Sequence, residues 1–176
     1  RISREIGDRA VESLCLGNLA SLYEILEDYE QAIEFGQRSL TVAQDIGDRE
    51  SESRALGNLG SICATQLKYP VAVDYYARSL RVAREIGDLQ GEKRALGDLG
   101  GILYAVGNRE QAIGYYQKSL EIAQAIGDRD GIETIPCNLA DIYETLGQQQ
   151  QSDKIAALAS LERNVSATAV SSEEPD

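Results

Sequence analysis

Apolar side chains recur at helical spacing along the chain, in stripes that a short polar turn interrupts. Between residues 96 and 106 they follow the i, i+3, i+6, i+7 and i+10 spacing of one helix face, as Leu96, Leu99, Ile102, Leu103 and Val106. Gly107 and Asn108 then interrupt the stripe. A second stripe of apolar and small side chains follows at Ala112, Ile113, Tyr115, Tyr116, Leu120, Ile122, Ala123 and Ile126. The pattern predicts two helices joined by a short turn.

The pattern of this segment occurs four times at a spacing of forty residues. The tripeptide Ile-Gly-Asp occupies 6–8, 46–48, 86–88 and 126–128. The tetrapeptide Leu-Gly-Asn-Leu at 16–19 and 56–59 becomes Leu-Gly-Asp-Leu at 96–99 and Pro-Cys-Asn-Leu at 136–139. A fixed period of this size is typical of repeat arrays, which stack unit on unit and present a long curved surface. The chain is therefore expected to be an all-α solenoid that binds another protein.

The Gly-Asp pair of each unit predicts where one helix ends and the next begins. Glycine reaches the left-handed conformation of a helix C-cap without a Cβ penalty, and aspartate is a preferred N-cap. Short links between helices of roughly 17 residues, about 25 Å long, make neighbouring helices antiparallel. The predicted units are residues 8–47, 48–87, 88–127 and 128–163, and the last of them contains a polar capping helix.

Both ends of the chain differ from these units. Residues 1–7 match residues 81–87, the end of a second helix, so they are expected to be the end of a preceding repeat helix in a longer protein. The N-terminal edge of the array would then be exposed and available for self-association. Residues 164–176 are rich in Ser, Ala and acidic residues and are expected to be a disordered tail.

Two prolines have different expected effects. Pro70 falls in the first turn of a predicted helix, where proline is tolerated. Pro136 falls inside the predicted first helix of the last unit, where proline removes an N–H donor and clashes with the preceding turn. That helix is therefore expected either to begin late, near Thr134, or to be kinked.

Small and large side chains also alternate in a fixed register. The first helices carry Leu16, Leu19, Ala20 and Tyr23, and later Pro136, Leu139, Ala140 and Tyr143. The second helices carry Ala72, Tyr76 and Ser79, then Ala112, Tyr116 and Ser119. This alternation resembles the tetratricopeptide repeat, and the forty-residue period is similar to that of LGN/Pins-type adaptors and of bacterial and cyanobacterial signalling proteins. The resemblance implies a right-handed superhelix of antiparallel helix pairs, with first helices lining a concave groove for an extended peptide.

Composition and charge narrow the function further. The formal net charge of -12 predicts repulsion from nucleic acid and from anionic membranes, so neither is an expected partner. No apolar run reaches the roughly 20 residues that span a bilayer. With no histidine, P-loop, nucleophile elbow or spaced ligand set, we expect no catalytic residue, metal or cofactor. The cysteines Cys15, Cys63 and Cys137 are interpreted as reduced, buried residues of a cytoplasmic protein.

A polar register on the first helices is the candidate peptide-binding site. Its side chains share one helix side, because positions three or four apart lie on the same face. They are Asn18, Ser21, Arg54, Asn58, Ser61, Arg94, Asp98, Asn138 and Asp141. An asparagine amide offers a donor and an acceptor to one peptide group, and an arginine can pair with a carboxylate of the ligand. At roughly 10 Å between units, successive asparagines would meet every third peptide of an extended chain.

Several of these features also have a purely structural interpretation. The asparagines could hydrogen-bond to the adjacent helix, Gly17, Gly57 and Gly97 could serve close helix packing, and Arg54 and Arg94 could be solvated charges. An acidic set is expected to be a solvated edge, or alternatively a patch for a basic partner; it comprises Glu24, Glu27, Asp28, Glu30 and Glu34. The predicted function is a protein-interaction scaffold. The alternatives are self-association through the solenoid ends and a sensor array of a larger signalling ATPase, kinase or protease.

Overall fold

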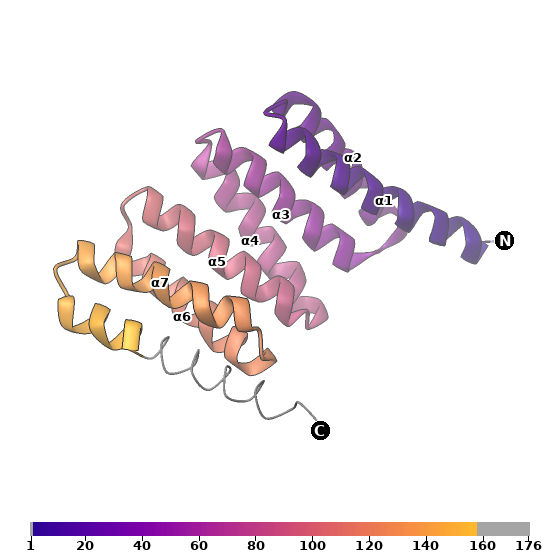
Figure 1. Cartoon of the computed structure of the whole chain (residues 1–176). Coiled ribbons are helices and arrows are strands. Elements are labelled where there is room, and N and C mark those ends of the chain that lie inside the picture. The colour runs from indigo at the N-terminus through magenta and orange to yellow at the C-terminus, as the bar shows by residue number, and fades with distance from the viewer. Residues whose placement is uncertain (1, 158–176) are drawn as a thin grey trace, which may run out of the picture.

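The computed structural model describes residues 2–157, with side chains described from residue 8 onward. Every regular element in this part of the chain is a helix (Figure 1). The helices are α1 Ile2–Ile25, α2 Tyr29–Ile46, α3 Arg49–Thr65, α4 Tyr69–Ile86, α5 Leu89–Ala105, α6 Arg109–Ile126 and α7 Arg129–Thr145. A further helical segment occupies residues 149–157. The capping-helix prediction continues past residue 157, and both that part and the predicted tail lie outside the described residues.

The Gly-Asp links form as the sequence predicts at three of their four positions. Gly47, Gly87 and Gly127 end the second helices in the left-handed conformation, with φ of 72°, 71° and 69°. The carboxylate of Asp48 then accepts the backbone N–H of Ser51 and begins α3. The fourth pair, residues 7 and 8, lies within α1 and does not end a helix.

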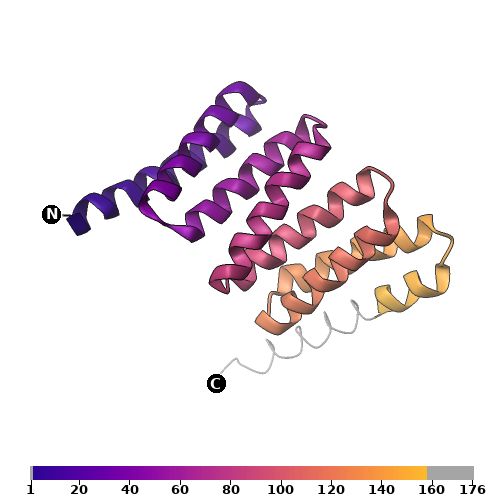
Figure 2. The same ribbon diagram turned by 180° about the vertical axis from the view of Figure 1, so that it is seen from behind.

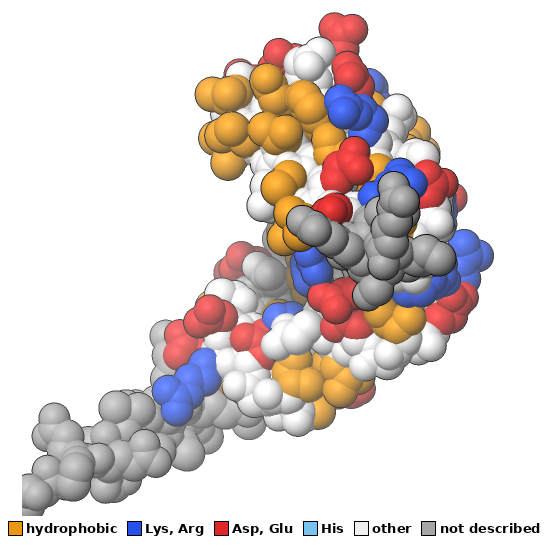
Figure 3. Space-filling view, turned by 90° about the vertical axis from the view of Figure 1, so that its right-hand side faces the viewer, with side chains coloured by type: hydrophobic (Ala, Val, Ile, Leu, Met, Phe, Trp, Pro, Cys, Tyr) orange, Lys and Arg blue, Asp and Glu red, His pale blue; other side chains and the backbone are white. Residues whose placement is uncertain are grey.

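Consecutive helices pack against one another from α1 to α7, which confirms the α-solenoid of helix pairs. The first helices α1, α3, α5 and α7 form one layer, and α2, α4 and α6 form the other (Figures 1 and 2). Seen along the stack, the molecule is curved and hollowed on the side of the first helices (Figure 3). The predicted curved surface is therefore built mainly from α1, α3, α5 and α7.

A pair of serines joins the two helices within a unit. In the second unit, Ser79 Oγ donates to the Ser53 carbonyl at 2.8 Å, and Ser53 Oγ donates back to the Ser79 carbonyl at 3.2 Å. Ser13 and Ser39 form the same reciprocal bonds in the first unit. These buried hydroxyls are fully partnered, as a close approach of two helices requires.

Helix α7, the first helix of the fourth unit, contains a proline in its interior. Helix α7 runs from Arg129 through Pro136 to Thr145, so the expected late start near Thr134 is wrong. Pro136 is buried, in the register of Leu56 and Leu96. Burial of the ring in the core offsets part of the roughly 3 kcal/mol that a proline costs inside a helix.

The predicted burial of the cysteines is right for one of three. Cys63 is buried in the core, whereas Cys15 and Cys137 are exposed. Cys15 lies at the N-terminal end of the array, on a side of α1 that no described helix covers. Cys137 stands in the register of Gly17 and Gly57, at the edge of the concave face. The sequence pattern did not distinguish these positions from the core.

Replacing Gly60 by Ala is expected to destabilise the protein by about 1–2 kcal/mol. A Cβ at Gly60 would lie 2.7 Å from Cε1 of Tyr76, a buried ring with little room to move. Overpacking of this kind costs about 1–3 kcal/mol, more than the roughly 1 kcal/mol that alanine gains in helix propensity. Urea unfolding followed by circular dichroism measures the difference.

Gly57 provides the matched control for that substitution. A Cβ at Gly57 would lie 3.8 Å from Ser79 Oγ, an ordinary contact. Gly57→Ala is therefore expected to be neutral or to stabilise by up to about 1 kcal/mol. Equal shifts in the urea midpoint for the two variants would contradict the packing explanation.

Candidate peptide-binding groove

Small pockets lie between consecutive first helices and follow one another along the concave layer. The pocket between α1 and α3 is lined by Leu14, Asn18, Arg54 and Asn58, among others. The next pocket, between α3 and α5, shares Arg54 and adds Arg94 and Asp98. A wider depression between α5 and α7 shares Arg94 and Asp98. Five of the predicted site residues thus form one continuous strip across α1, α3 and α5: Asn18, Arg54, Asn58, Arg94 and Asp98.

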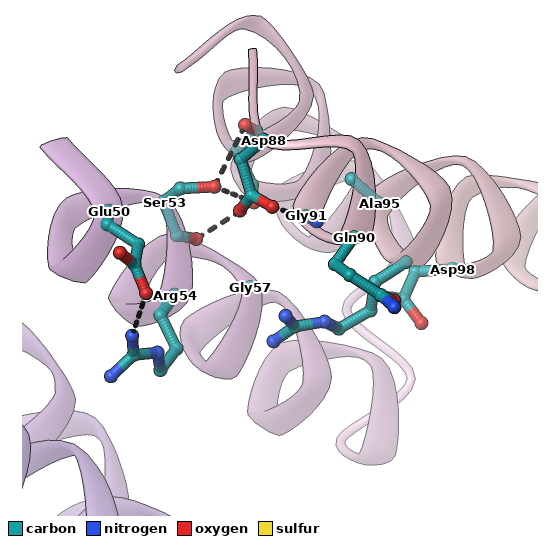
Figure 4. A pocket seen from close by; sticks show the side chains of 11 residues that line it. Glu50, Ser53, Arg54, Gly57, Asp88, Gln90, Gly91, Ala95 and Asp98 are labelled. Atoms are coloured by element: carbon teal, nitrogen blue, oxygen red, sulfur yellow. Dashed lines mark hydrogen bonds and ion pairs between the residues drawn. The ribbon is translucent and has the colours of Figure 1, made fainter. Parts of the chain in front are cut away.

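The pocket between α3 and α5 has room for about 110 Å³. Sites for whole small molecules usually measure about 300–1,000 Å³, so this pocket suits one side chain of a longer ligand. Figure 4 shows its walls, with Glu50 and Arg54 on α3 and Asp98 on α5. An occupant would therefore contact two repeats at once.

The asparagine amides of the strip are free to bind. Among the described residues, no side chain or backbone group hydrogen-bonds to the amide of Asn18, Asn58 or Asn138. Asn58 extends toward α1, because its Nδ2 lies 3.8 Å from where a Cβ at Gly17 would stand. The absence of a side chain at Gly17 leaves space beside this amide. A peptide group placed there could take both the donor and the acceptor of Asn58.

The two arginines differ in their partners. Arg54 Nη2 donates to the Glu50 carboxylate at 2.7 Å, one turn earlier in α3. Arg94 is exposed and forms no ion pair within residues 8–157. A ligand carboxylate would therefore find an unpaired guanidinium at Arg94, whereas at Arg54 it would compete with Glu50.

Asp98 occupies the asparagine register but has a different electrostatic environment. Burial raises the pKa of its carboxyl to about 6, and the positive charge of Arg94 works in the opposite direction. The negative charge of Asp98 in turn contributes to the raised pKa values of Tyr76 and Tyr116, after the larger effect of burial. Both hydroxyls therefore lie near this carboxyl. Sequence reasoning did not identify Tyr76 and Tyr116 as neighbours of the site, because their register marks them as core residues.

Ser21 and Ser61 are already engaged in hydrogen bonds. Ser21 Oγ donates to the Gly17 carbonyl of its own helix at 3.3 Å. Ser61 Oγ donates to the Glu24 carboxylate at 2.8 Å, and Thr65 Oγ1 donates to the same carboxylate at 3.2 Å. Glu24 thus links α1 to α3, and its assignment to a solvated edge is wrong. Glu24 and Ser61 are 37 residues apart, so no local sequence pattern predicted this contact.

Asn138 and Asp141 are exposed on α7 and line none of these pockets. They continue the register beyond Asp98 on α7, and no further first helix packs beside α7 within residues 2–157. The strip is therefore best developed from α1 to α5. It holds amides, one free guanidinium and one half-buried carboxyl, which are groups that bind peptide backbone and charged side chains.

Other kinds of site were sought in the described part of the chain. It contains no group of three or more Cys, Asp or Glu side chains placed to hold a metal ion. None of its helices is long and apolar enough to cross a bilayer.

Comparison with protein families identifies the fold class. The tetratricopeptide repeat model matches residues 10–85 and 93–159, well over half of the chain, so this chain belongs to the tetratricopeptide repeat family. These repeats form protein-interaction scaffolds and are generally non-catalytic. The comparison with curated proteins gives no significant match.

Solved structures share the fold at low sequence identity. BtubC (BKLC) from P. vanneervenii is 21% identical with a TM-score of 0.77, over 93% of this chain and 66% of that one. The STAND ATPase with a tetratricopeptide repeat sensor from Pyrococcus horikoshii is 23% identical with a TM-score of 0.75, over 90% and 25%. A Rap protein complexed with competence and sporulation factor is 15% identical with a TM-score of 0.73, over 89% and 44%. The chain spans between a quarter and two thirds of these structures.

Proposed function

We propose that the chain captures an extended peptide segment of a partner protein along the strip between its first helices. The observation that carries this proposal is the pair of unpartnered amides of Asn18 and Asn58, which line one pocket between two adjacent repeats. An amide in a shallow groove can replace the water that solvates a peptide group, with a donor and an acceptor in one side chain. Recurrence of that group at Asn18, Asn58 and Asn138 favours an extended ligand.

The charged residues of the strip would set the direction and composition of the ligand. Arg94, which is unpaired, would bind an acidic side chain or a carboxyl terminus. Asp98 would accept a hydrogen bond from a backbone N–H or a basic side chain while it is ionised. Because these two side chains lie one turn apart on α5, the ligand would present opposite charges in close succession.

Two similar structures support this proposal at the level of the fold. The Rap protein was solved in a complex with competence and sporulation factor, and the STAND ATPase carries its repeats as a sensor. The second case favours an alternative in which the strip senses a ligand and regulates a domain elsewhere in a longer protein. Both functions use the same surface, so the first test is common to them.

The triple variant Asn18→Ala, Asn58→Ala, Asn138→Ala is expected to bind a groove ligand at least tenfold more weakly. Each lost hydrogen bond contributes about 0.5–1.5 kcal/mol, and three together correspond to roughly tenfold to a thousandfold in affinity. A library of displayed unstructured peptides is selected against the wild-type chain, and calorimetry measures the affinity of the winning peptide for both proteins. The same two proteins are then used as baits in a native lysate.

The control removes polar groups from the opposite layer. Gln111 and Lys118 lie on α6, away from the strip, and line a shallow depression. The variant Gln111→Ala, Lys118→Ala should bind the selected peptide as the wild type does. Equal affinity for wild type and triple variant, with the helical spectrum unchanged, would place binding on another face.

A further inference from the structure

The second helices of the first three units carry an aromatic ring and a cation at two equivalent positions. The pairs recur at the forty-residue spacing of the units and are Phe35 with Arg38, Tyr75 with Arg78, and Tyr115 with Lys118. The Arg38 guanidinium lies over the Phe35 ring at 5.4 Å, and the Arg78 guanidinium lies over the Tyr75 ring at 5.6 Å. These residues belong to α2, α4 and α6, the layer opposite the strip (Figure 2).

In the first two units a carboxylate accompanies the cation. Glu34 Oε1 lies 3.8 Å from Arg38 Nη1, and Asp74 Oδ2 lies 3.6 Å from Arg78 Nη1. Each carboxylate stands one turn before its cation, on the same side of the helix. The residue at this position in the third unit is Gly114. The third unit therefore has the ring and the cation without the carboxylate.

The third unit has an open depression and a free cation at this place. Four side chains and backbone groups of α6 line a depression of about 330 Å³, which we term the anion site: Gln111, Gly114, Tyr115 and Lys118. Within residues 8–157, Lys118 forms no ion pair and no side-chain hydrogen bond. The Tyr115 ring is half-buried against the core and fixes one wall. The anion site thus offers a cation, an amide and an apolar wall to a ligand.

Packing does not require glycine at position 114. A Cβ at Gly114 would meet no atom within 4 Å, and the backbone φ of this residue is not positive. Among the side chains described from residue 8 onward, a Cβ at any other helical glycine would lie within 4 Å of a neighbour. Glycine inside a helix lowers the stability of the helix relative to alanine. A ligand that approaches the helix backbone closely would account for it.

The charges around the anion site favour an acidic ligand. Arg81 on α4 is also exposed and forms no ion pair in the described part of the chain. Adjacent second helices thus present Arg81 and Lys118 as uncompensated cations on a chain whose net charge is -12. Glu121 lies one turn after Lys118 and does not pair with it. A segment with several acidic side chains complements this part of the surface.

We propose that an acidic segment of a partner protein docks on the layer of second helices, with one aspartate or glutamate side chain in the anion site. Its carboxylate pairs with Lys118 beside Gly114, in the position that Glu34 and Asp74 hold in the first two units. Its methylene groups contact the Tyr115 ring. This contact does not depend on peptide capture by the strip, which lies on the opposite layer.

An NMR titration of the whole chain tests the site. The probe is a peptide of alternating glutamate and serine, and the matched probe has glutamine in place of glutamate. The backbone signal of Gly114 and the side-chain signals of Lys118 should shift with the acidic peptide and stay in place with the neutral one. Unmoved signals with the acidic peptide would overturn the proposal. Sodium acetate at the same carboxylate concentration should shift them less, and equal shifts would overturn the assignment to a protein segment.

Two substitutions at Gly114 separate charge from size. Gly114→Asp supplies from within the chain the carboxylate that Asp74 supplies in the second unit. Measured from the Lys118 shifts, it should bind the acidic peptide about two- to fivefold more weakly than Gly114→Asn. Aspartate and asparagine are similar in size and helix propensity, so their comparison isolates the charge. Equal affinities for the two variants would contradict occupation of the site by a carboxylate.

The reverse change should create the site in the second unit. Asp74→Gly removes the carboxylate beside Arg78, so the acidic peptide should then shift the Arg78 side-chain signals as well. In the wild type these signals should move less, because Asp74 already pairs with Arg78. The helical circular dichroism spectrum shows that the variant is folded. Arg78 signals that respond equally in the two proteins would overturn the comparison between units on which the proposal rests.

Discussion

Replacing Leu59 by Ala is expected to lower the free energy of unfolding by about 3–4 kcal/mol. Leu59 is 1% exposed and packs directly on Gly36 of the preceding helix pair, so its removal leaves a cavity between two units. The backbone on the α2 side is already in contact, and the site has little freedom to collapse. Urea unfolding followed at the helical circular dichroism band measures the loss.

Leu19 supplies the matched control in the same register of the preceding unit. It is 37% exposed, so Leu19→Ala removes less buried surface than Leu59→Ala and should cost only about 1–2 kcal/mol. The two substitutions are identical in helix propensity, which therefore cancels from the comparison. Similar losses at the two positions would contradict the conclusion that each unit is stabilised by its predecessor.

Replacing Asp98 by Asn is expected to stabilise the protein by about 1–2 kcal/mol at pH 7.5. Burial raises the pKa of Asp98 to about 6 from its ordinary 3.8, so the ionised carboxyl is less favourable in the folded chain than in the unfolded one. The full difference corresponds to about 3 kcal/mol, and partial solvent exposure reduces it. Asparagine already occupies this register at residues 58 and 138, so its shape is tolerated.

The pH dependence of that gain has a definite sign. The folded chain holds the Asp98 proton more tightly, so the penalty that Asp98 imposes on wild-type stability falls as pH falls from about 6 toward 4, and the advantage of Asp98→Asn shrinks over the same range. Asp128 behaves oppositely, because its ion pair with Lys93 lowers the pKa of its carboxyl, and its contribution is lost only at lower pH. The reverse substitution at the equivalent position of the preceding unit, Asn58→Asp, should lower the stability of the protein at pH 7.5. A pH-independent difference between wild type and Asp98→Asn would contradict this assignment.

Local sequence signals predicted the fold closely because each is tied to one backbone conformation. The Gly-Asp pairs mark where α2, α4 and α6 end and where α3, α5 and α7 begin, since glycine reaches the left-handed C-cap and aspartate is a preferred N-cap. Asp48 and Asp88 accept a backbone N–H of the helix that follows, whereas the carboxylate of Asp128 pairs with Lys93. At residues 7 and 8 the same pair lies within a continuous helix.

Features that depend on neighbouring units were harder to predict. Cys15 is exposed because it lies at the end of the stack of described helices, whereas the residues at the equivalent positions of the later units are buried. The bond from Ser61 to Glu24 joins residues 37 apart, beyond any local pattern. The raised pKa of Asp98 depends on how the surrounding helices bury it, which the sequence does not give. The register alone did align Asn18, Asn58, Arg54 and Arg94 along one strip.

The side-chain amide signals of the asparagines in a nitrogen–proton NMR spectrum test peptide capture most directly. Asn58 reports from the middle of the strip, and Asn108 is an internal control because its side chain caps α6. On saturation with the selected peptide, the Asn18 and Asn58 signals should shift while the Asn108 signal stays in place. Unchanged Asn18 and Asn58 signals, with perturbations confined to α2, α4 and α6, would contradict capture between the first helices.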